Sequence, residues 1–509
     1  MWCLPRRNIT LGNIDYNDKL FLPEHLNTYA EIIAMPSGNS HETSSGVFSL
    51  APAFLKEMQQ VSAQEVSAPP GKNQLKSLRA AIAGNVLEWF DWTLYAIFST
   101  YIASHFFDNS EPTSALLSTL AVFAAGFLAR PLGGLAFGRL ADLRGRKFVL
   151  VATISTMSVA CLMIAFIPSF ESIGVWASVL LLVARLLQGF AHGGESGVAY
   201  TYVSEIAPAP RRGLWSSSVF FAVTLGVMLA TLLGALFNAV LGQQAVADGG
   251  WRWAFVLGAA FGLFVLVLRR SATETEEFVS AESSPDQSGA AVRWTAGRKF
   301  KAGALVVLLS CGHNCAYYVW AIFASSLAIS DRGMDATDAF TASLLAQAVA
   351  LGALVLCGRL SDKYGRRPMI IAFGLFAMVS FYPLSLLITD QPWTLFVAQA
   401  AGMSIWAMGA AMYPAFISEL FPTHIRATSV AFATSVSVAL FGGTAPYLLT
   451  WSADIGSGWI FWAWTALLAG LAVIGGTLVK ETRGTDLGSV QWPYRERTPQ
   501  GQPTKVSTP

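Results

Sequence analysis

The chain has 509 residues, of which 54% are hydrophobic and 13% charged, and its formal net charge is +2. Soluble domains are about one quarter charged, so this composition indicates an integral membrane protein. It argues against a nucleic-acid partner, which would call for a strongly basic surface. The five cysteines show neither metal-ligand spacing nor a disulfide framework. We therefore expect no metal site and interpret the cysteines as small apolar filler.

The first predicted element is a tail. Residues 1–74 are polar and interrupted by Pro, Gly and Ser, which predicts an N-terminal segment without fixed structure. Met58 is also a sensible start codon, so we consider the hypothesis that the residues before it are a gene-start artefact. N-terminal sequencing of the native protein tests this hypothesis.

Twelve predicted membrane spans follow the tail. A bilayer-crossing helix needs about 20 mostly apolar residues, and a long polar segment, 271–300, separates two groups of six such runs. We therefore predict an N-terminal six-helix bundle (75–270), a linker (271–300), a C-terminal six-helix bundle (301–480) and a short tail (481–509). The runs are 80–104, 114–137, 148–168, 175–200, 214–240, 251–269, 302–328, 339–357, 369–388, 393–417, 427–450 and 459–479.

The basic residues predict an orientation. Lys and Arg gather in the loops of one side, including Arg269 and Arg270 at the end of the sixth span, whereas the opposite side holds little beyond Arg252 and Arg332. By the positive-inside rule, both termini and the linker are expected in the cytoplasm. The chain is thus predicted to be a multi-pass plasma-membrane protein whose partners include the lipid bilayer.

Two motif pairs indicate an internal repeat. "GRLADLRGRK" at 138–147 corresponds to "GRLSDKYGRR" at 358–367, 220 positions later, between the second and third span of each half. "SEIAPAPRR" at 204–212 corresponds to "SELFPTHIR" at 418–426, 214 positions later, between the fourth and fifth span. Basic loops that only set topology would not repeat the Asp, the Gly pair and the Ser-Glu. An all-α protein of two six-helix repeats is typical of secondary transporters.

Ionisable side chains inside the spans of the first half mark a functional site. Helix 1 and helix 4 each place four polar or aromatic residues on one face at 3-4-3 spacing, Asp91 lies at the edge of the first set, and helix 2 adds Arg130. The two sets are Asn85, Glu88, Trp92 and Tyr95, and Arg185, Gln188, His192 and Glu195.

The economical arrangement surrounds a common cavity with helices 1, 2 and 4, so that both arginines oppose the three carboxylates. One carboxyl group is then left without a cation of its own, and such a group binds a proton readily in an apolar medium. Glu88, Asp91 and Glu195 are therefore candidates for proton coupling, with His192 as a relay. The alternative is a static ion-pair cluster, although static pairs rarely outperform apolar packing.

The second half carries fewer charges. We expect His313, Tyr317 and Gln347 to form a wall that orients a small metabolite. The alternative for His313 is an ordinary hydrogen-bonded core residue.

The chain resembles a known family. Gly138-x3-Asp142-x2-Gly145-Arg146-Lys147 is similar to the signature loop of the major facilitator superfamily. "GFLARPLGG" at 126–134 and "RLLQGFAHGGESG" at 185–197 resemble the metabolite:proton symporter branch, and the wording looks closest to its 2-oxoglutarate permeases. The resemblance implies the major facilitator fold, alternating access and a proton gradient as driving force, with no cofactor.

The same resemblance implies a gate. In that family the loop aspartate joins a charge network with basic residues and with the acidic residue after the fourth helix. This network closes the cytoplasmic side when the cavity faces outward. The corresponding residues are Arg139, Asp142, Arg146 and Glu205 in the first half and Arg359, Asp362, Arg366 and Glu419 in the second.

Two substrate classes remain open. Arg130 and Arg185 suit a di- or tricarboxylate such as 2-oxoglutarate, whereas an aromatic cage that includes Trp89 and Tyr318 suits a zwitterion such as proline or glycine betaine. The tail lacks the long coiled coil of osmosensing betaine carriers, which favours the organic acid. An enzyme is not supported, because no nucleophile–base set or phosphate loop is present. A channel or a membrane-embedded sensor remains an alternative.

Overall fold

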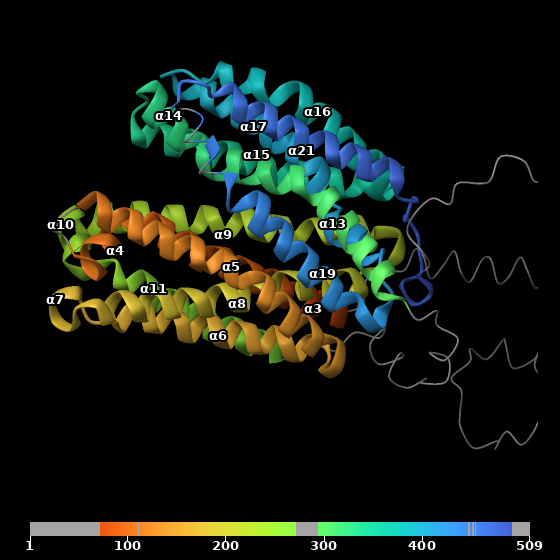
Figure 1. The fold of residues 1–509 in the computed structure, drawn as a ribbon, viewed down its shortest axis with the longest axis horizontal. Coiled ribbons are helices and arrows are strands. Elements are labelled where there is room, and N and C mark those ends of the chain that lie inside the picture. Colours follow the sequence, from red (N-terminus) through yellow and green to blue (C-terminus); the bar gives the residue numbers. More distant parts are fainter. Residues whose placement is uncertain are drawn as a thin grey trace, which may run out of the picture. The chain divides into compact units, whose positions relative to one another are not determined.

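The computed structural model describes residues 72–108, 112–270, 294–445, 448–449, 452 and 455–490. Within these ranges the chain is built from helices (Figure 1). The predicted tail up to residue 71, most of the linker and the last stretch of the chain lie outside the described residues.

The helices of the first half coincide with the six predicted spans. Helix α3 begins at Lys72, inside the predicted tail, and α4 continues it as part of the first span, while the short helices α7 (Phe170–Ile173) and α10 (Gln243–Ala245) lie between spans. The six spans are α3 (Lys72–Ile97) with α4 (Ser99–Phe106), α5 (Pro112–Arg144), α6 (Arg146–Phe166), α8 (Val175–Ile206), α9 (Arg212–Leu241) and α11 (Arg252–Arg270).

The second half repeats this order, and two of its spans are interrupted. A π-helical stretch follows α13, and a second one follows α19. The six spans are α13 (Ala296–Tyr317) with η4 (Tyr318–Phe323) and α14 (Ala324–Arg332), α15 (Ala336–Tyr364), α16 (Arg366–Leu387), α17 (Pro392–Ala410) with α18 (Tyr413–Ser418), α19 (Thr423–Ser437) with η5 (Val438–Gly442), and α21 (Trp459–Leu478).

Two sequence expectations about interruptions need correction or stay open. The tenth span, expected as one run, turns between Ala410 and Tyr413, where Pro414 lacks the N–H that would continue the hydrogen-bond ladder. In the eleventh span, Pro446 follows Gly442 and Gly443, a pattern that suits a bend, but Pro446 lies outside the described residues.

Eleven helices in the described ranges are long and apolar enough to cross a membrane. The remaining predicted span is α3, which is less apolar because it carries Asn85, Glu88 and Asp91. Each of these three side chains is at most 1% exposed. The least apolar span therefore places its polar residues inside the protein.

The packing of the helices follows the repeat. In the first half α5 packs on α8, α6 on α11 and α3 on α9; in the second half α15 packs on α17, α16 on α21 and α13 on α19. Between the halves, α5 packs on α19 and α15 on α9. The second helix of each half thus contacts the fifth helix of the other, and the predicted twelve-helix, two-repeat fold is confirmed.

Glycines allow the close approach of α5 and α8. A Cβ on Gly189 would overlap the backbone of Gly126, and a Cβ on Gly193 would overlap the backbone of Arg130. Small residues at such crossings let helix backbones meet in a membrane. This contact brings Arg130 against the helix that carries Arg185.

Candidate functional site

Two buried arginines lie over the same aromatic ring. The Cζ atoms of Arg130 and Arg185 are 4.2 Å and 4.1 Å from the ring centroid of Trp92. Arg130 also lies over Phe127 at 4.3 Å, and Arg185 over Tyr95 at 4.2 Å. The two arginines are 2% and 0% exposed. These are cation–π contacts in a site from which water is largely excluded.

Neither arginine has the carboxylate partner that the sequence led us to expect. No ion pair of the described residues includes Arg130 or Arg185. Their Nε and Nη2 atoms are buried without a hydrogen bond of normal geometry to that part of the chain. These two atoms form one edge of the planar guanidinium, and such an edge can bind a carboxylate in bidentate fashion.

Glu88 is held by two side chains from α8. One carboxyl oxygen accepts a hydrogen bond from Ser196 Oγ at 2.8 Å and lies 2.9 Å from Nε2 of His192. The other oxygen is buried with no partner among the described residues. Glu88 is 0% exposed, so its charge state depends on a small number of contacts that can be changed.

Asp91 has a different partner, which the sequence did not indicate. Cys161 Sγ, on α6, donates to Asp91 at 3.1 Å and accepts from the side-chain amide of Gln188 at 3.2 Å. Gln188 in turn accepts from Arg185 at 2.7 Å. Cys161 was expected to be apolar filler, and this expectation was wrong, because the thiol connects Asp91 to the Arg185 chain of contacts.

Glu195 does not share the cavity of the two arginines. Both of its carboxylate oxygens accept hydrogen bonds from Arg269 on α11, and one of them also accepts from Thr153 on α6. Glu195 lies about 60° around the helix from His192, which turns it toward α6 and α11. The expected arrangement considered only helices 1, 2 and 4. It also assigned Arg269 to a surface loop, although this residue is 2% exposed.

The predicted wall from the second half closes over these groups. Trp89 contacts Tyr317 with ring centroids 5.3 Å apart, and Phe220 contacts His313 at 5.6 Å and Trp406 at 5.5 Å. The ring nitrogens of His313 and the hydroxyl of Tyr317 are buried without a hydrogen bond of normal geometry in the described ranges. The role of His313 in an orienting wall stays a prediction, beside the alternative of an ordinary core residue.

The remaining predicted site residues are partly occupied within the protein. The Asn85 amide donates to Ala81 O at 3.1 Å, and the Tyr95 hydroxyl donates to Thr119 O at 3.1 Å. Gln347 makes a long contact of 3.5 Å to Ala321 O and leaves its own oxygen buried and unpartnered. Of these three, Gln347 retains the most unused hydrogen-bonding capacity.

The repeated loops lie at one end of the helices, which we call the basic end. The aspartate of each loop accepts hydrogen bonds from the other half of the protein. Asp142 accepts from the backbone N–H groups of Ala427 and Thr428 at 3.1 and 2.9 Å, at the start of α19. Asp362 accepts from the N–H groups of Gly213 and Leu214 at 2.7 and 2.8 Å, at the start of α9. A carboxylate at a helix N-terminus is favoured by both hydrogen bonds and the helix dipole.

The glycines of these loops have two distinct roles. Gly145 and Gly365 have φ values of 94° and 107° and form the turns before α6 and α16. A Cβ on Gly138 would overlap Thr428, and one on Gly358 would lie about 3 Å from Gly213 and Leu214. One glycine of each loop therefore makes the turn, as predicted, and the other permits contact between the halves.

At the basic end, each of two glutamates forms ion pairs with one arginine of its own half and one arginine of the other half. Glu205 pairs with Arg146 of its own half at 3.2 Å and with Arg426 of the second half at 2.7 Å. Glu419 pairs with Arg366 of its own half at 3.5 Å and with Arg212 of the first half at 3.1 Å. Six of the eight predicted gate residues thus lie together. The repeat "SEIAPAPRR"/"SELFPTHIR" contained the signal for the two missed arginines.

The other two predicted gate residues need correction. Arg139 and Arg359 are exposed and take part in none of the ion pairs of the described residues. Each precedes its loop aspartate by three residues and lies on the outer side of its helix. They fit the role of topology-setting charges better than that of gate members.

The segment after α21, at the start of the predicted short tail (481–509), contacts these ion pairs. Arg212 donates to the carbonyl of Thr485 at 2.9 Å, and Arg426 donates to the carbonyl of Leu487. Thr482 Oγ1 donates to Glu419 at 2.6 Å, and Glu481 accepts from the backbone N–H of Arg366 at 2.8 Å. Residues 481–487 therefore bind both sets of cross-pairs.

We expect Asp142→Asn and Asp362→Asn each to slow substrate exchange about tenfold while the Kd changes little. Each substitution removes a charge that supports hydrogen bonds between the halves, worth about 1.5–3 kcal/mol in total for such charge-assisted contacts. The measurement is exchange of labelled substrate in proteoliposomes beside equilibrium binding. The control is Asp390→Asn, at an exposed aspartate. Normal exchange in both loop variants would leave the loops with a topological role only.

The comparisons with known proteins agree with this geometry. The family model of the Major Facilitator Superfamily matches residues 81–446 and 309–497. The alpha-ketoglutarate permease of Escherichia coli (strain K12) is 32% identical over 405 residues, covering 79% of this chain and 93% of that protein. The citrate-proton symporter of Klebsiella pneumoniae is 33% identical over 387 residues, covering 75% and 86%.

The chain is also similar to a third transporter and to a solved structure. A Staphylococcus haemolyticus (strain JCSC1435) protein described as a proline/betaine transporter is 32% identical, covering 75% of this chain and 82% of that protein. The solved structure of the proton:xylose symporter XylE superposes with a TM-score of 0.70 at 19% identity, covering 82% and 98%; at that identity it supports the fold alone. The helices, the duplicated loops and these matches together show that this multi-pass membrane protein belongs to the major facilitator superfamily.

Proposed function

We propose that the protein is a secondary active transporter of the plasma membrane. It carries a small organic acid, a di- or tricarboxylate such as 2-oxoglutarate, together with protons by alternating access. The observation that supports this most directly is the pair Arg130 and Arg185, two buried guanidinium groups with unpartnered edges. The permease and the citrate symporter among the relatives act on substrates of this class by their names.

The energetics of the arginines favour an anion. Removing an ion from water costs several kcal/mol even after relaxation, whereas a desolvated cation–π contact returns about 2 kcal/mol. The contacts of Arg130 and Arg185 with Trp92 therefore do not offset the free energy that their desolvation costs. Ion pairs with two carboxylate groups of one substrate would offset the remainder.

Proton coupling follows from the acidic groups beside the arginines. With Glu88 and Asp91 protonated, the site carries two positive charges and matches a dianion. When the two protons leave, the carboxylates compete with the substrate for the same cations. Binding of protons and binding of substrate thus favour each other, which is the requirement for symport. His192 lies against Glu88 and can pass the proton on.

The gate residues would alternately close and open one side of the protein. We place the basic end, with Asp142, Asp362 and the paired glutamates, in the cytoplasm according to the distribution of Lys and Arg. Its cross-pairs are closed in this structure, and the substrate site is buried. Opening requires that Glu205 and Glu419 exchange their partners in the other half for water, a change between two states of similar free energy.

The second candidate is a zwitterion such as proline or glycine betaine. Trp89, Tyr317 and Trp406 form a continuous aromatic set, with ring centroids 5.3 and 5.1 Å apart along it, which suits a quaternary amine. The ring of Trp92, however, is already in contact with both arginines. Trp92 is therefore not available to a cationic ligand as a further wall of this aromatic cage.

The test is uptake by proteoliposomes under an imposed pH gradient, acidic outside. Labelled 2-oxoglutarate is expected to accumulate, and unlabelled citrate or 2-oxoglutarate to compete with it. Competition by glycine betaine or proline alone would select the second candidate. Equilibration of the label without accumulation would indicate a channel, and binding without any uptake a sensor.

A further inference from the structure

A file of polar and small residues runs through the first half from Glu88 to the basic end. On α3, Ser77, Ala81, Gly84 and Glu88 follow at spacings of four, three and four, so they share one face of the helix. Eleven residues of helix span about 16 Å. The helices on which α3 mainly packs are all in the first half, namely α4, α6, α8, α9 and α11.

The opposing face on α8 carries the matching groups. His192, Glu195 and Tyr202 follow at spacings of three and seven on that helix. Near one end His192 lies against Glu88, and near the other Tyr202 lines a pocket together with Ser77. Glu195, between these two ends, contacts Thr153 of α6 and Arg269 of α11.

Arg269 lies between the two ends of this file. It donates to Glu195 and to the carbonyl of Leu150. A Cβ on Gly84 would overlap its guanidinium, and the arginine lies close enough to Glu88 to interact with it electrostatically. Its Nε is buried with no partner in the described part of the chain. The guanidinium of Arg269 is therefore paired with Glu195 and also interacts with Glu88.

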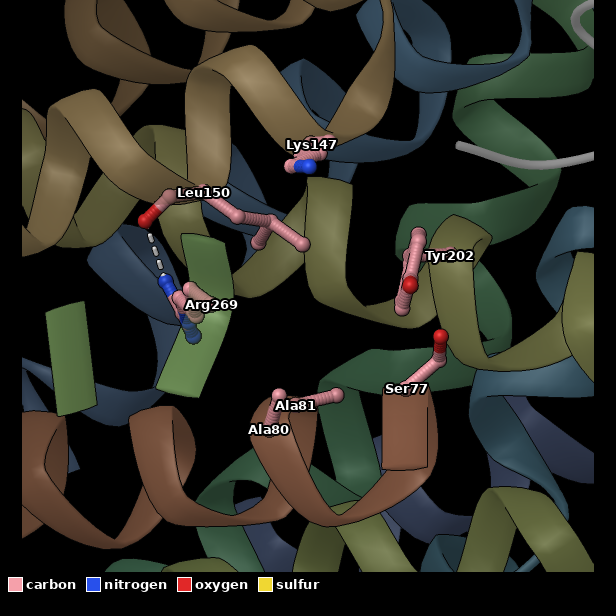
Figure 2. Close-up of a pocket in the computed structure, with 7 residues that line it drawn as sticks. All are labelled: Ser77, Ala80, Ala81, Lys147, Leu150, Tyr202 and Arg269. Atoms are coloured by element: carbon pink, nitrogen blue, oxygen red, sulfur yellow. Dashed lines mark hydrogen bonds between the residues drawn. The ribbon is translucent and has the colours of Figure 1, made fainter. Parts of the chain in front are cut away.

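A pocket lies on the far side of Arg269 (Figure 2). Figure 2 shows Arg269 at one end of it and the hydroxyl groups of Ser77 and Tyr202 at the other. Its volume is about 10 Å³, close to what one water molecule needs. Its remaining lining residues are Ala80, Ala81, Lys147 and Leu150.

We propose that protons leave Glu88 for the basic end through this file, separately from the substrate, and that the Arg269–Glu195 ion pair is the stopper that closes the route between Glu88 and the pocket. The inference rests on the proposed proton-coupled transport. In the step, the O–H bond of protonated Glu88 breaks and a new O–H bond forms on a water molecule that enters when Arg269 and Glu195 separate, and this water passes a proton on to the water of the pocket. The electron pair stays on the carboxylate, whose charge Arg269 compensates.

The stopper explains how coupling survives a water-accessible pocket. While Arg269 and Glu195 remain paired, they lie between Glu88 and the pocket and prevent water from connecting the two. The separation of the pair therefore decides when a proton bound at Glu88, delivered with the substrate, can leave.

The first test removes the stopper without leaving a lone buried charge. The double variant Arg269→Gln/Glu195→Gln is reconstituted with a pH-sensitive dye inside the liposomes, and no substrate is added. We expect it to dissipate an imposed pH gradient severalfold faster than the wild type, because two neutral side chains no longer hold each other across the passage as the ion pair does. A dissipation rate equal to that of the wild type in the folded variant would overturn the proposal.

The second test narrows the pocket. Ala81→Val adds two carbon atoms to its lining, and Ala96→Val makes the same change at an exposed position of the same helix. We expect Ala81→Val to slow pH-driven uptake of labelled 2-oxoglutarate severalfold and to spare exchange, which needs no proton release. Equal uptake in both variants, or a parallel fall of uptake and exchange in Ala81→Val, would overturn the separate route.

The two proposals fail in different ways. A wild-type protein that does not accumulate 2-oxoglutarate contradicts the proposed substrate, yet the dye experiment needs no substrate and still judges the stopper. Accumulation by the wild type together with an unchanged leak in the double variant contradicts the route alone.

Discussion

Arg185→Lys is expected to weaken the binding of 2-oxoglutarate between roughly ten- and a hundredfold, because charge-assisted hydrogen bonds are worth about 1.5–3 kcal/mol. Lysine keeps the positive charge but lacks the planar edge that binds a carboxylate at two points. The same loss is expected for Arg130→Lys. The Kd is measured by titration calorimetry of the purified protein in detergent.

The control for these variants is Arg270→Lys, at an exposed arginine at the end of α11. Arg130 and Arg185 are proposed to bind different carboxylates of one substrate. Each variant should therefore lose more affinity for a dicarboxylate than for a monocarboxylate. An unchanged Kd for 2-oxoglutarate in both variants would remove the arginines from the substrate site. Retained binding of glycine betaine would then move the site to the aromatic set.

Glu88→Gln is expected to abolish pH-driven accumulation and to leave exchange of substrate intact. The glutamine oxygen can still accept from Ser196 and from His192, whose partners lie 2.8 and 2.9 Å from the present carboxyl oxygen. The shape of the site is thus retained, but no proton can be bound or released at residue 88. Net uptake and exchange are measured in the same proteoliposomes.

Asp91→Asn separates the two acidic candidates. Asp91 accepts a weak hydrogen bond from Cys161 and is connected through Gln188 to Arg185, so its neutralisation should alter substrate affinity as well as coupling. Normal accumulation by Glu88→Gln together with loss by Asp91→Asn would assign the proton to Asp91. Normal accumulation by both would contradict proton binding at this cluster.

One helix connects the proposed substrate site with the proposed gate residues. Arg130 lies on α5, which packs on α19 of the second half and carries Asp142 at its end. A change at the substrate site can therefore reach the cross-pairs through one continuous helix. The interruption of α19 by the π-helical stretch η5, at the level of the aromatic wall, offers a place where such a change can be absorbed.

Much of the architecture was predictable from the sequence, because its signals are local or repeated. Apolar runs of sufficient length located the spans, and two motif pairs at offsets of 220 and 214 positions showed the duplication. The loop glycines predicted turns that now show positive φ at Gly145 and Gly365. Helical spacing alone grouped Glu88 with Trp92, and Arg185 with Gln188 and His192.

The sequence by itself thus determined the membrane location, the twelve helices, their repeat and the set of polar residues inside them. Only the tertiary structure decided how those residues pair: Glu195 with Arg269, Asp91 with Cys161, and the paired arginines with the segment after α21. The physical reason is that partners in a helical membrane protein come from helices far apart in the chain. Their choice depends on the rotation of each helix and on close glycine contacts, neither of which a linear pattern records.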